Sequence, residues 1–198
     1  METVIYFVRH AQSDPRAYFH RPDWFDCPLS ELGEKQANQL SNIVLDLNIE
    51  HVISSPYIRC IDTIRPFVES HKAPMTIHEN VRERLVSKTF LDDFYKVWVK
   101  SWKDFNFKIP GCESSSEAQE RFVKAVKDIS LTHQGKIIAI VTHGNVLGLF
   151  LNYIDSLNHM EEAEKIRNPD VIRVVHRESR FVWDRDFRAQ GLDVIATR

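Results

Sequence analysis

Short apolar runs alternate with amphipathic stretches along most of the chain. The β-branched and aromatic run from Thr3 to Val8 predicts a buried strand, and Lys136 to Thr142 predicts another. Further strands are predicted at residues 51–54, 75–78, 171–176 and 180–183. Helical spacing of apolar positions predicts helices at about 30–47, 56–70, 91–105, 114–131, 145–155 and 160–167. Ser30 suits the N-cap of the first helix.

Nearly continuous apolar strands separated by helices are typical of a sheet that is covered on both faces. We therefore expect an α/β fold, namely a three-layer α/β/α sandwich with a mostly parallel central sheet. The pattern shows no repeat or linker, so a single domain is expected over residues 1–198. In such sheets ligands bind beyond the carboxyl ends of the strands.

Four of the predicted strands are followed by ionisable or polar side chains. Arg9 and His10 follow the first strand, Arg59 follows the strand at 51–54, Glu83 follows the strand at 75–78, and His143 and Asn145 follow the strand at 136–142. Unpaired ionisable groups are costly to gather at one sheet edge unless they have partners or a ligand. Guanidinium groups match the oxygens of a phosphate monoester, a neutral histidine can attack phosphorus, and a glutamate can supply and retake a proton. Arginines repel a metal ion, so no metal site is expected.

Composition limits the classes of partner. The 26 Lys and Arg residues nearly balance 28 Asp and Glu residues, so neither a nucleic-acid nor a membrane partner is expected. The three cysteines are widely spaced and odd in number, which favours a reducing, cytoplasmic location over a disulfide framework. The N-terminus lacks a signal-peptide pattern, and no apolar run approaches the roughly 20 residues that span a bilayer. A small phosphorylated substrate is the partner that the strand ends indicate.

The ordered set of motifs resembles the histidine phosphatase superfamily, also called the phosphoglycerate mutase-like family. The motifs are Arg9-His10, Ser54-Ser55-Pro56 with Arg59 and Thr63, Glu83 between two arginines, Thr142-His143-Gly144-Asn145, and Asn168-Pro169-Asp170. The resemblance implies that His10 is the nucleophile that forms a phosphohistidine, and that Glu83 donates a proton to the leaving alcohol and later activates water. It also implies that Arg9, Arg59 and His143 hold the phosphoryl oxygens, without a metal or cofactor.

The chain departs from the family pattern at three places. Ala11 replaces the usual glycine after the nucleophile, so the turn there must avoid positive φ. Arg16 stands where the family often has asparagine, and Cys112 interrupts a Gly-Glu-Ser motif.

Several assignments stay open at the level of sequence. Glu79 and Glu113 compete with Glu83 as the carboxylate in the pocket, and Asn145 either caps the following helix or also donates to the phosphate. The segment 14–29 either covers the site or is a surface loop. The stripe of Phe94, Trp98 and Trp102 is expected in the core.

Three functions fit the sequence. The leading one is a metal-independent phosphomonoester hydrolase of the phosphatase branch. The alternative is a phosphoglycerate mutase that depends on bisphosphoglycerate and uses the same site. The interval between Glu83 and His143 is shorter than the mutases of the family generally have, which favours the phosphatase. A binding module with a silent site is the third possibility, which the intact set of site residues disfavours.

Overall fold

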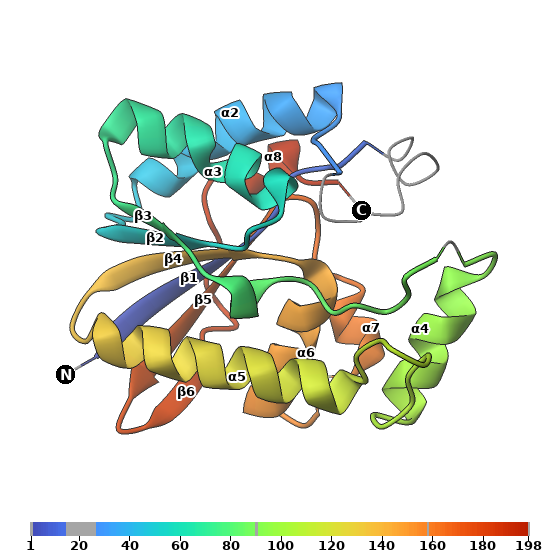
Figure 1. Ribbon diagram of the computed structural model, residues 1–198. Helices are drawn as coiled ribbons and strands as arrows, with labels where there is room; N and C mark the ends of the chain where they lie inside the picture. Colours follow the sequence, from blue (N-terminus) through green and yellow to red (C-terminus); the bar gives the residue numbers. More distant parts are fainter. Residues whose placement is uncertain (1, 15–26, 90, 158, 198) are drawn as a thin grey trace.

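The computed structural model describes residues 2–14, 27–89, 91–157 and 159–197, and its elements form one six-stranded sheet between two layers of helices (Figure 1). The strands lie in the order β3-β2-β4-β1-β5-β6. Their bounds are Thr3–Arg9 (β1), His51–Ser54 (β2), Met75–Ile77 (β3), Ile137–Thr142 (β4), Asp170–Arg177 (β5) and Arg180–Trp183 (β6). The first four strands pair in parallel, whereas β5 pairs antiparallel with both β1 and β6. The expected α/β sandwich with a mostly parallel sheet is confirmed.

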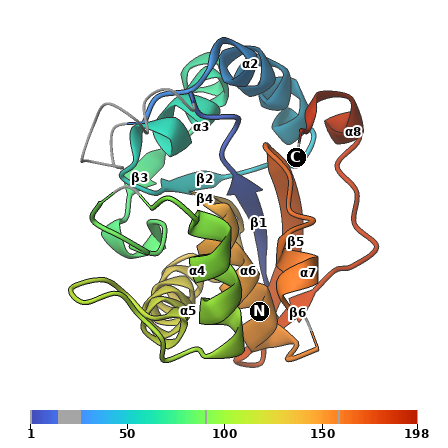
Figure 2. The ribbon, with the colours of Figure 1, turned by 90° about the vertical axis from the view of Figure 1, so that its right-hand side faces the viewer.

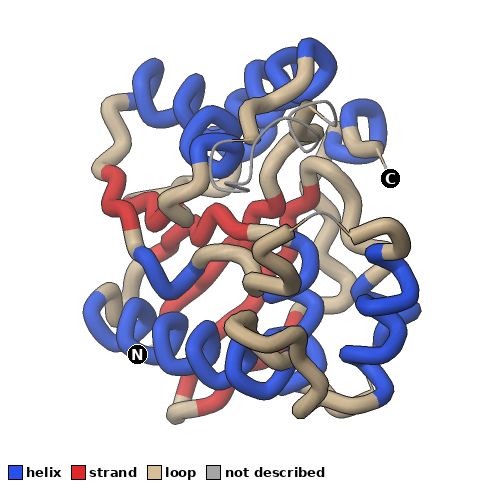
Figure 3. Tube along the Cα trace, turned by 45° about the vertical axis from the view of Figure 1, so that its right-hand side comes forward, coloured by secondary structure: helices blue, strands red, loops and turns tan. Residues whose placement is uncertain are grey.

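Helices cover both faces of this sheet, as the coloured tube shows (Figure 3). On one face lie α2 (Glu31–Leu45), α3 (Ile58–His71) and α8 (Leu192–Ile195); on the other lie α5 (Ser115–Thr132), α6 (Gly144–Ile154) and α7 (Met160–Ala163). A short 3₁₀ helix, η2 (Glu79–Val81), follows β3, and α4 (Phe94–Lys103) stands near α6 (Figure 2). None of the described helices is long and apolar enough to cross a membrane.

Strand alternation divides the core into two clusters. Ile5 and Phe7 point to the α5–α6 side, where the Phe7 ring lies 5.0 Å from the ring of Phe150. Tyr6 and Val8 point to the opposite side and pack with α2 and α3. Because neighbouring residues of a strand face opposite layers, a strand that is apolar throughout stabilises both.

Local signals determine where the long helices begin. The Ser30 hydroxyl accepts a hydrogen bond from the Gly33 amide, as predicted for an N-cap. Ser114 and Glu117 form a capping box at the start of α5. The helix predicted at 160–167 is wrong in length, because α7 ends at Ala163. The backbone groups that would continue the helix make other hydrogen bonds. The Ile166 carbonyl accepts from Arg9, and the Arg167 amide donates to a carboxylate oxygen of Asp170.

Residues 15–26 lie outside the described part of the chain. They include Arg16 and most of the segment 14–29, for which the sequence allows either a cover over the site or a surface loop. Ala11 is fully buried and is not among the residues with positive φ, in agreement with the turn expected for alanine.

Candidate active site

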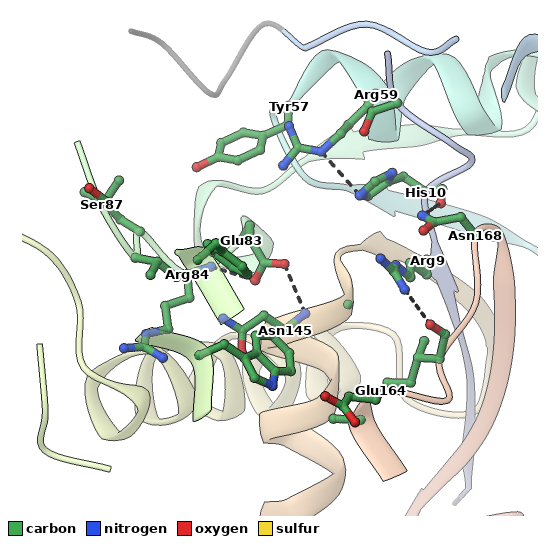
Figure 4. A pocket seen from close by; sticks show the side chains of 18 of the residues that line it. Arg9, His10, Tyr57, Arg59, Glu83, Arg84, Ser87, Asn145, Glu164 and Asn168 are labelled. Carbon is green, nitrogen blue, oxygen red and sulfur yellow. Dashed lines mark hydrogen bonds between the residues drawn. The ribbon is translucent and has the colours of Figure 1, made fainter. Parts of the chain in front are cut away.

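A cleft of about 680 Å³ opens beyond the carboxyl ends of β1 and β4. Five of the six predicted site residues line it: Arg9, His10, Arg59, Glu83 and Asn145. They come from the end of β1, from α3, from the segment after η2 and from α6, so the fold gathers side chains that are far apart in the sequence (Figure 4). The sixth, His143, is fully buried and does not line the cleft.

His10 is held on three sides. Its Nδ1 lies 2.7 Å from the Ala11 carbonyl, which assigns the ring proton to Nδ1 and leaves Nε2 as an acceptor. Arg59 Nε donates to that Nε2 at 3.3 Å, and Asn168 Nδ2 donates to the His10 carbonyl at 2.7 Å. Burial, followed by the positive charges of Arg59 and Arg9, lowers the pKa of His10 well below 6.5. The ring is therefore neutral at neutral pH, with an available lone pair on Nε2.

The Arg9 guanidinium lies against the first turn of α6. Arg9 Nη1 donates to the Ile166 carbonyl. A Cβ added to Gly144 would lie 2.8 Å from Arg9 Cζ and 2.9 Å from Arg9 Nε. The absence of a side chain at Gly144 thus provides the space in which the guanidinium reaches the cleft.

His143 lies next to His10, with the two ring centroids 5.2 Å apart. The Ser55 hydroxyl lies 2.8 Å from its Nε2. Burial, then the charge of Arg59, lowers the pKa of His143 well below 6.5, so this ring is also neutral. Cys60 Sγ lies 3.4 Å from the same Nε2, and burial raises the pKa of its thiol to about 12, as for a cysteine that packs in the core.

Glu83 bridges the cleft and the amino end of α6. Its Oε2 accepts from the Asn145 amide at 3.1 Å, and its Oε1 accepts from the amides of Val146 at 2.9 Å and Arg84 at 2.8 Å. A carboxylate in this position is favoured by the helix dipole. Glu83 therefore satisfies the first-turn amides that a capping side chain would otherwise satisfy.

Of the two roles that the sequence leaves open for Asn145, the helix cap is excluded, because His143 occupies the N-cap position of α6. The helix begins at Gly144, so Asn145 lies within its first turn. Both polar atoms of the Asn145 side chain are buried and have no hydrogen-bond partner in the described part of the chain. Because a buried amide without partners is costly, this side chain is suited to a ligand at the cleft.

Glu113 and Glu79 do not line the cleft, which leaves Glu83 as the one of the three candidates that does. Glu113 instead pairs with Arg82 at 2.9 Å and Arg121 at 2.8 Å. Burial raises the pKa of Glu113, but the hydrogen bonds from Arg121 and Arg82 outweigh it and lower the pKa to about 2. Glu79 makes a surface ion pair with Arg82.

One wall of the cleft is not predicted by the sequence pattern. Phe94 and Trp98, expected in the core, line the cleft instead, together with Tyr95. Phe94 is 47% exposed, and the rings of Phe94 and Trp98 lie 6.3 Å apart. Four-residue spacing shows that side chains share a helix face, but it does not distinguish a core face from a cleft wall.

No group of three or more His, Cys, Asp or Glu side chains among the described residues could hold a metal ion. The cleft instead presents a neutral histidine, two guanidinium groups and a carboxylate at the carboxyl edge of the sheet. This arrangement defines an α/β protein whose site is suited to a phosphoryl group.

Comparison with known proteins gives the family. Residues 5–186 match the histidine phosphatase superfamily (branch 1), and the chain belongs to this superfamily, whose members act on small phosphorylated substrates. The probable phosphoglycerate mutase GpmB of Erwinia tasmaniensis is 29% identical over 184 residues, which cover 88% of this chain and 86% of the relative. The protein of the same name from Salmonella choleraesuis is 27% identical over 188 residues, which cover 90% and 87%.

Solved structures share the fold. A mycobacterial glucosyl-3-phosphoglycerate phosphatase with VO3 aligns with a TM-score of 0.76 at 18% identity, covering 91% of this chain and 97% of that chain. A phosphoserine phosphatase mutant from Entamoeba histolytica aligns with a TM-score of 0.70 at 18% identity, covering 91% and 94%. The similar proteins thus include phosphatases and probable phosphoglycerate mutases.

Proposed function

We propose that this enzyme is a metal-independent phosphomonoester hydrolase that works through a phosphohistidine on His10. The observation that carries the proposal is the state of His10, which is neutral and has Nε2 directed at Arg59. A nucleophile must keep its lone pair, and a buried imidazole between two guanidinium groups keeps it even in mildly acidic solution.

In the first step, the substrate phosphate binds between Arg9 and Arg59, and Arg59 exchanges its contact with Nε2 for a phosphoryl oxygen. The side-chain amide of Asn145 donates to the same group, and the buried His143 ring packs against His10. The Nε2 lone pair then forms a bond to phosphorus while the bond from phosphorus to the alcohol oxygen breaks. Glu83, which takes up the proton of the bound phosphate monoanion, gives that proton to the alcohol oxygen, so the alcohol leaves neutral. Fixed positive groups lower the barrier because they are already in place when charge shifts onto the oxygens.

In the second step, a water molecule takes the place of the alcohol. The Glu83 carboxylate accepts a proton from the water as its oxygen attacks phosphorus, and the nitrogen–phosphorus bond breaks. Glu83 returns this proton to the departing inorganic phosphate, so that His10 is neutral again and Glu83 is a carboxylate again.

The names of the curated relatives favour a second candidate, a bisphosphoglycerate-dependent phosphoglycerate mutase. It would use the same phosphohistidine but return the phosphoryl group to a second hydroxyl of the substrate. The two candidates differ in whether water or substrate accepts the group from His10.

The test is hydrolysis of p-nitrophenyl phosphate in EDTA by the wild type and by His10→Ala. The proposal expects hydrolysis that resists EDTA and is lost in the variant. Conversion of 3-phosphoglycerate to 2-phosphoglycerate, primed by bisphosphoglycerate and faster than release of phosphate, would support the mutase. Binding of phosphate without either reaction would overturn both and support a binding module.

A further inference from the structure

We infer that the alcohol part of the substrate is aromatic and uncharged, and that Trp98 and Glu164 select it. This inference rests on the proposed function, because it concerns the half of the same cleft that lies beyond the phosphate. The substrates it disfavours carry a carboxylate or a second phosphate on the alcohol, as phosphoglycerate does.

The first observation is an aromatic wall. Phe94, Tyr95 and Trp98 on α4 line the cleft with the apolar side chains of Leu85 and Leu91. The Trp98 ring packs against the Trp102 ring, one turn further along α4, with the ring centroids 6.1 Å apart. Aromatic faces bind flat apolar groups by stacking and by excluding water, and they do not stabilise a hydrated anion.

The second observation is the charge beside this wall. Glu164 lines the cleft at the end of α7, on the side opposite Arg59 (Figure 4). The negative charge of Glu164, followed by desolvation, raises the pKa of the Tyr95 phenol above 10.0. Tyr95 and Glu164 both line the cleft, so the negative charge lies beside the aromatic wall. An anionic group on the leaving alcohol would approach this carboxylate.

The third observation concerns the cation on this side. Arg84 lines the cleft, but its guanidinium donates to the Glu113 carbonyl at 3.0 Å and to the Ser115 hydroxyl at 2.9 Å. Figure 4 shows this guanidinium turned away from His10. No other lysine or arginine lines the cleft, within the described residues, apart from Arg9 and Arg59 at the phosphate end. Among the described residues, the positive charge that faces the cleft is therefore concentrated where the phosphoryl group binds.

Size is consistent with an aromatic alcohol. The cleft of about 680 Å³ is within the range of about 300–1,000 Å³ that small-molecule sites occupy. A phosphate group fills only its inner end, so room for a ring or fused rings remains along α4.

The test compares phenyl phosphate, 4-carboxyphenyl phosphate and β-glycerophosphate by kcat/KM. The wild type should prefer phenyl phosphate to its carboxylated form. Glu164→Gln should raise the ratio of carboxyphenyl to phenyl phosphate about threefold, as expected for one charge acting through water. The matched control is Glu162→Gln, because Glu162 lies on the same short helix, pairs with Lys165 and does not line this cleft. The control should leave the ratio unchanged.

Trp98→Leu should lower kcat/KM for phenyl phosphate about tenfold more than for β-glycerophosphate, and Trp98→Phe should restore much of the difference. A loss of activity or of folded protein that affects both substrates equally cancels in the ratio of the two kcat/KM values. The melting temperature of each variant is also measured. Equal effects on both substrates, or a wild type that prefers the carboxylated ester, would overturn the inference.

Binding separates this inference from the proposed function. Phenylphosphonate and 4-carboxyphenylphosphonate cannot be hydrolysed, and their dissociation constants are measured by calorimetry with the wild type and the same variants. The same preference in binding, with no hydrolysis of any ester, would contradict the proposed function alone. Hydrolysis of all esters without a preference in rate or in binding would contradict this inference alone.

Discussion

The glycine at the start of α6 provides the space for the Arg9 guanidinium, and filling that space should lower activity without unfolding the enzyme. In Gly144→Ala the new Cβ would lie 2.8 Å from Arg9 Cζ. Carbon atoms in ordinary contact are about 3.5 Å apart or more, so the guanidinium must withdraw by roughly 0.7 Å. A displacement near 1 Å of a group that positions the substrate can cost about 10²-fold in rate.

We therefore expect kcat/KM for p-nitrophenyl phosphate to fall by roughly 10- to 100-fold in Gly144→Ala. The free energy of unfolding should change by less than about 1 kcal/mol, because the clashing atoms are at the end of a flexible side chain and alanine restricts the unfolded chain. Activity and urea denaturation are measured on the same preparations.

A double-mutant cycle identifies the route of the effect. In the Arg9→Ala background the space is already empty, so Gly144→Ala should have little further effect on kcat/KM. If Gly144→Ala lowers activity by the same factor with and without Arg9, the effect does not pass through the guanidinium and the reasoning is refuted.

Three further predictions concern ionisable groups that are buried or half-buried. Glu113→Gln should lower the free energy of unfolding at pH 7 by about 2 kcal/mol, because solvent screens the half-buried ion pairs in part. The folded-state pKa of about 2 lies below the ordinary 4.5, so this difference should shrink as pH falls from 4.5 toward 2; a difference in urea denaturation that does not vary with pH would count against the ion pairs. Cys60, whose pKa burial raises to about 12, should resist a thiol reagent in the native enzyme and react after unfolding, and rapid native labelling of Cys60 would contradict its buried position. Because burial and then Arg59 and Arg9 lower the pKa of His10, kcat/KM should persist as pH falls below 6.5, and an acidic limb centred at 6.5 or above would exclude this environment for the nucleophile.

The layers of the fold could be predicted because they depend on patterns that are local in sequence. Continuous apolar strands such as 137–142 are typical of a sheet with two covered faces, and Ser30 and Ser114 supply caps that act within one turn. The antiparallel pairing of β5 with β1 could not be predicted, since an apolar strand has the same pattern in either direction. The early end of α7 depends on a carbonyl bonded by Arg9, a contact across most of the chain.

In the site, the residues that directly follow strands could be predicted from the sequence. The contacts that hold these residues in place could not. His10 and Glu83 stand where strand ends place chemistry, and the cleft includes both. The roles of Gly144 and Asn168 depend on three-dimensional contacts with Arg9 and with the His10 carbonyl, which no spacing reveals. The position of Trp98 in the cleft wall could not be predicted, because helical spacing alone does not distinguish a core face from a cleft wall.

The central claim is that His10 carries the phosphoryl group. The most direct test is to identify the nitrogen atom to which the phosphoryl group is attached. The enzyme is mixed with a phosphomonoester, quenched in alkali because acid hydrolyses phosphohistidine, and analysed by ³¹P NMR and peptide mass spectrometry. Since Nδ1 is bonded to the Ala11 carbonyl at 2.7 Å and Nε2 faces Arg59, phosphate should be found on Nε2 of His10 and be absent from His10→Ala. Phosphate on Nδ1, on another residue, or on no residue during turnover would contradict this account.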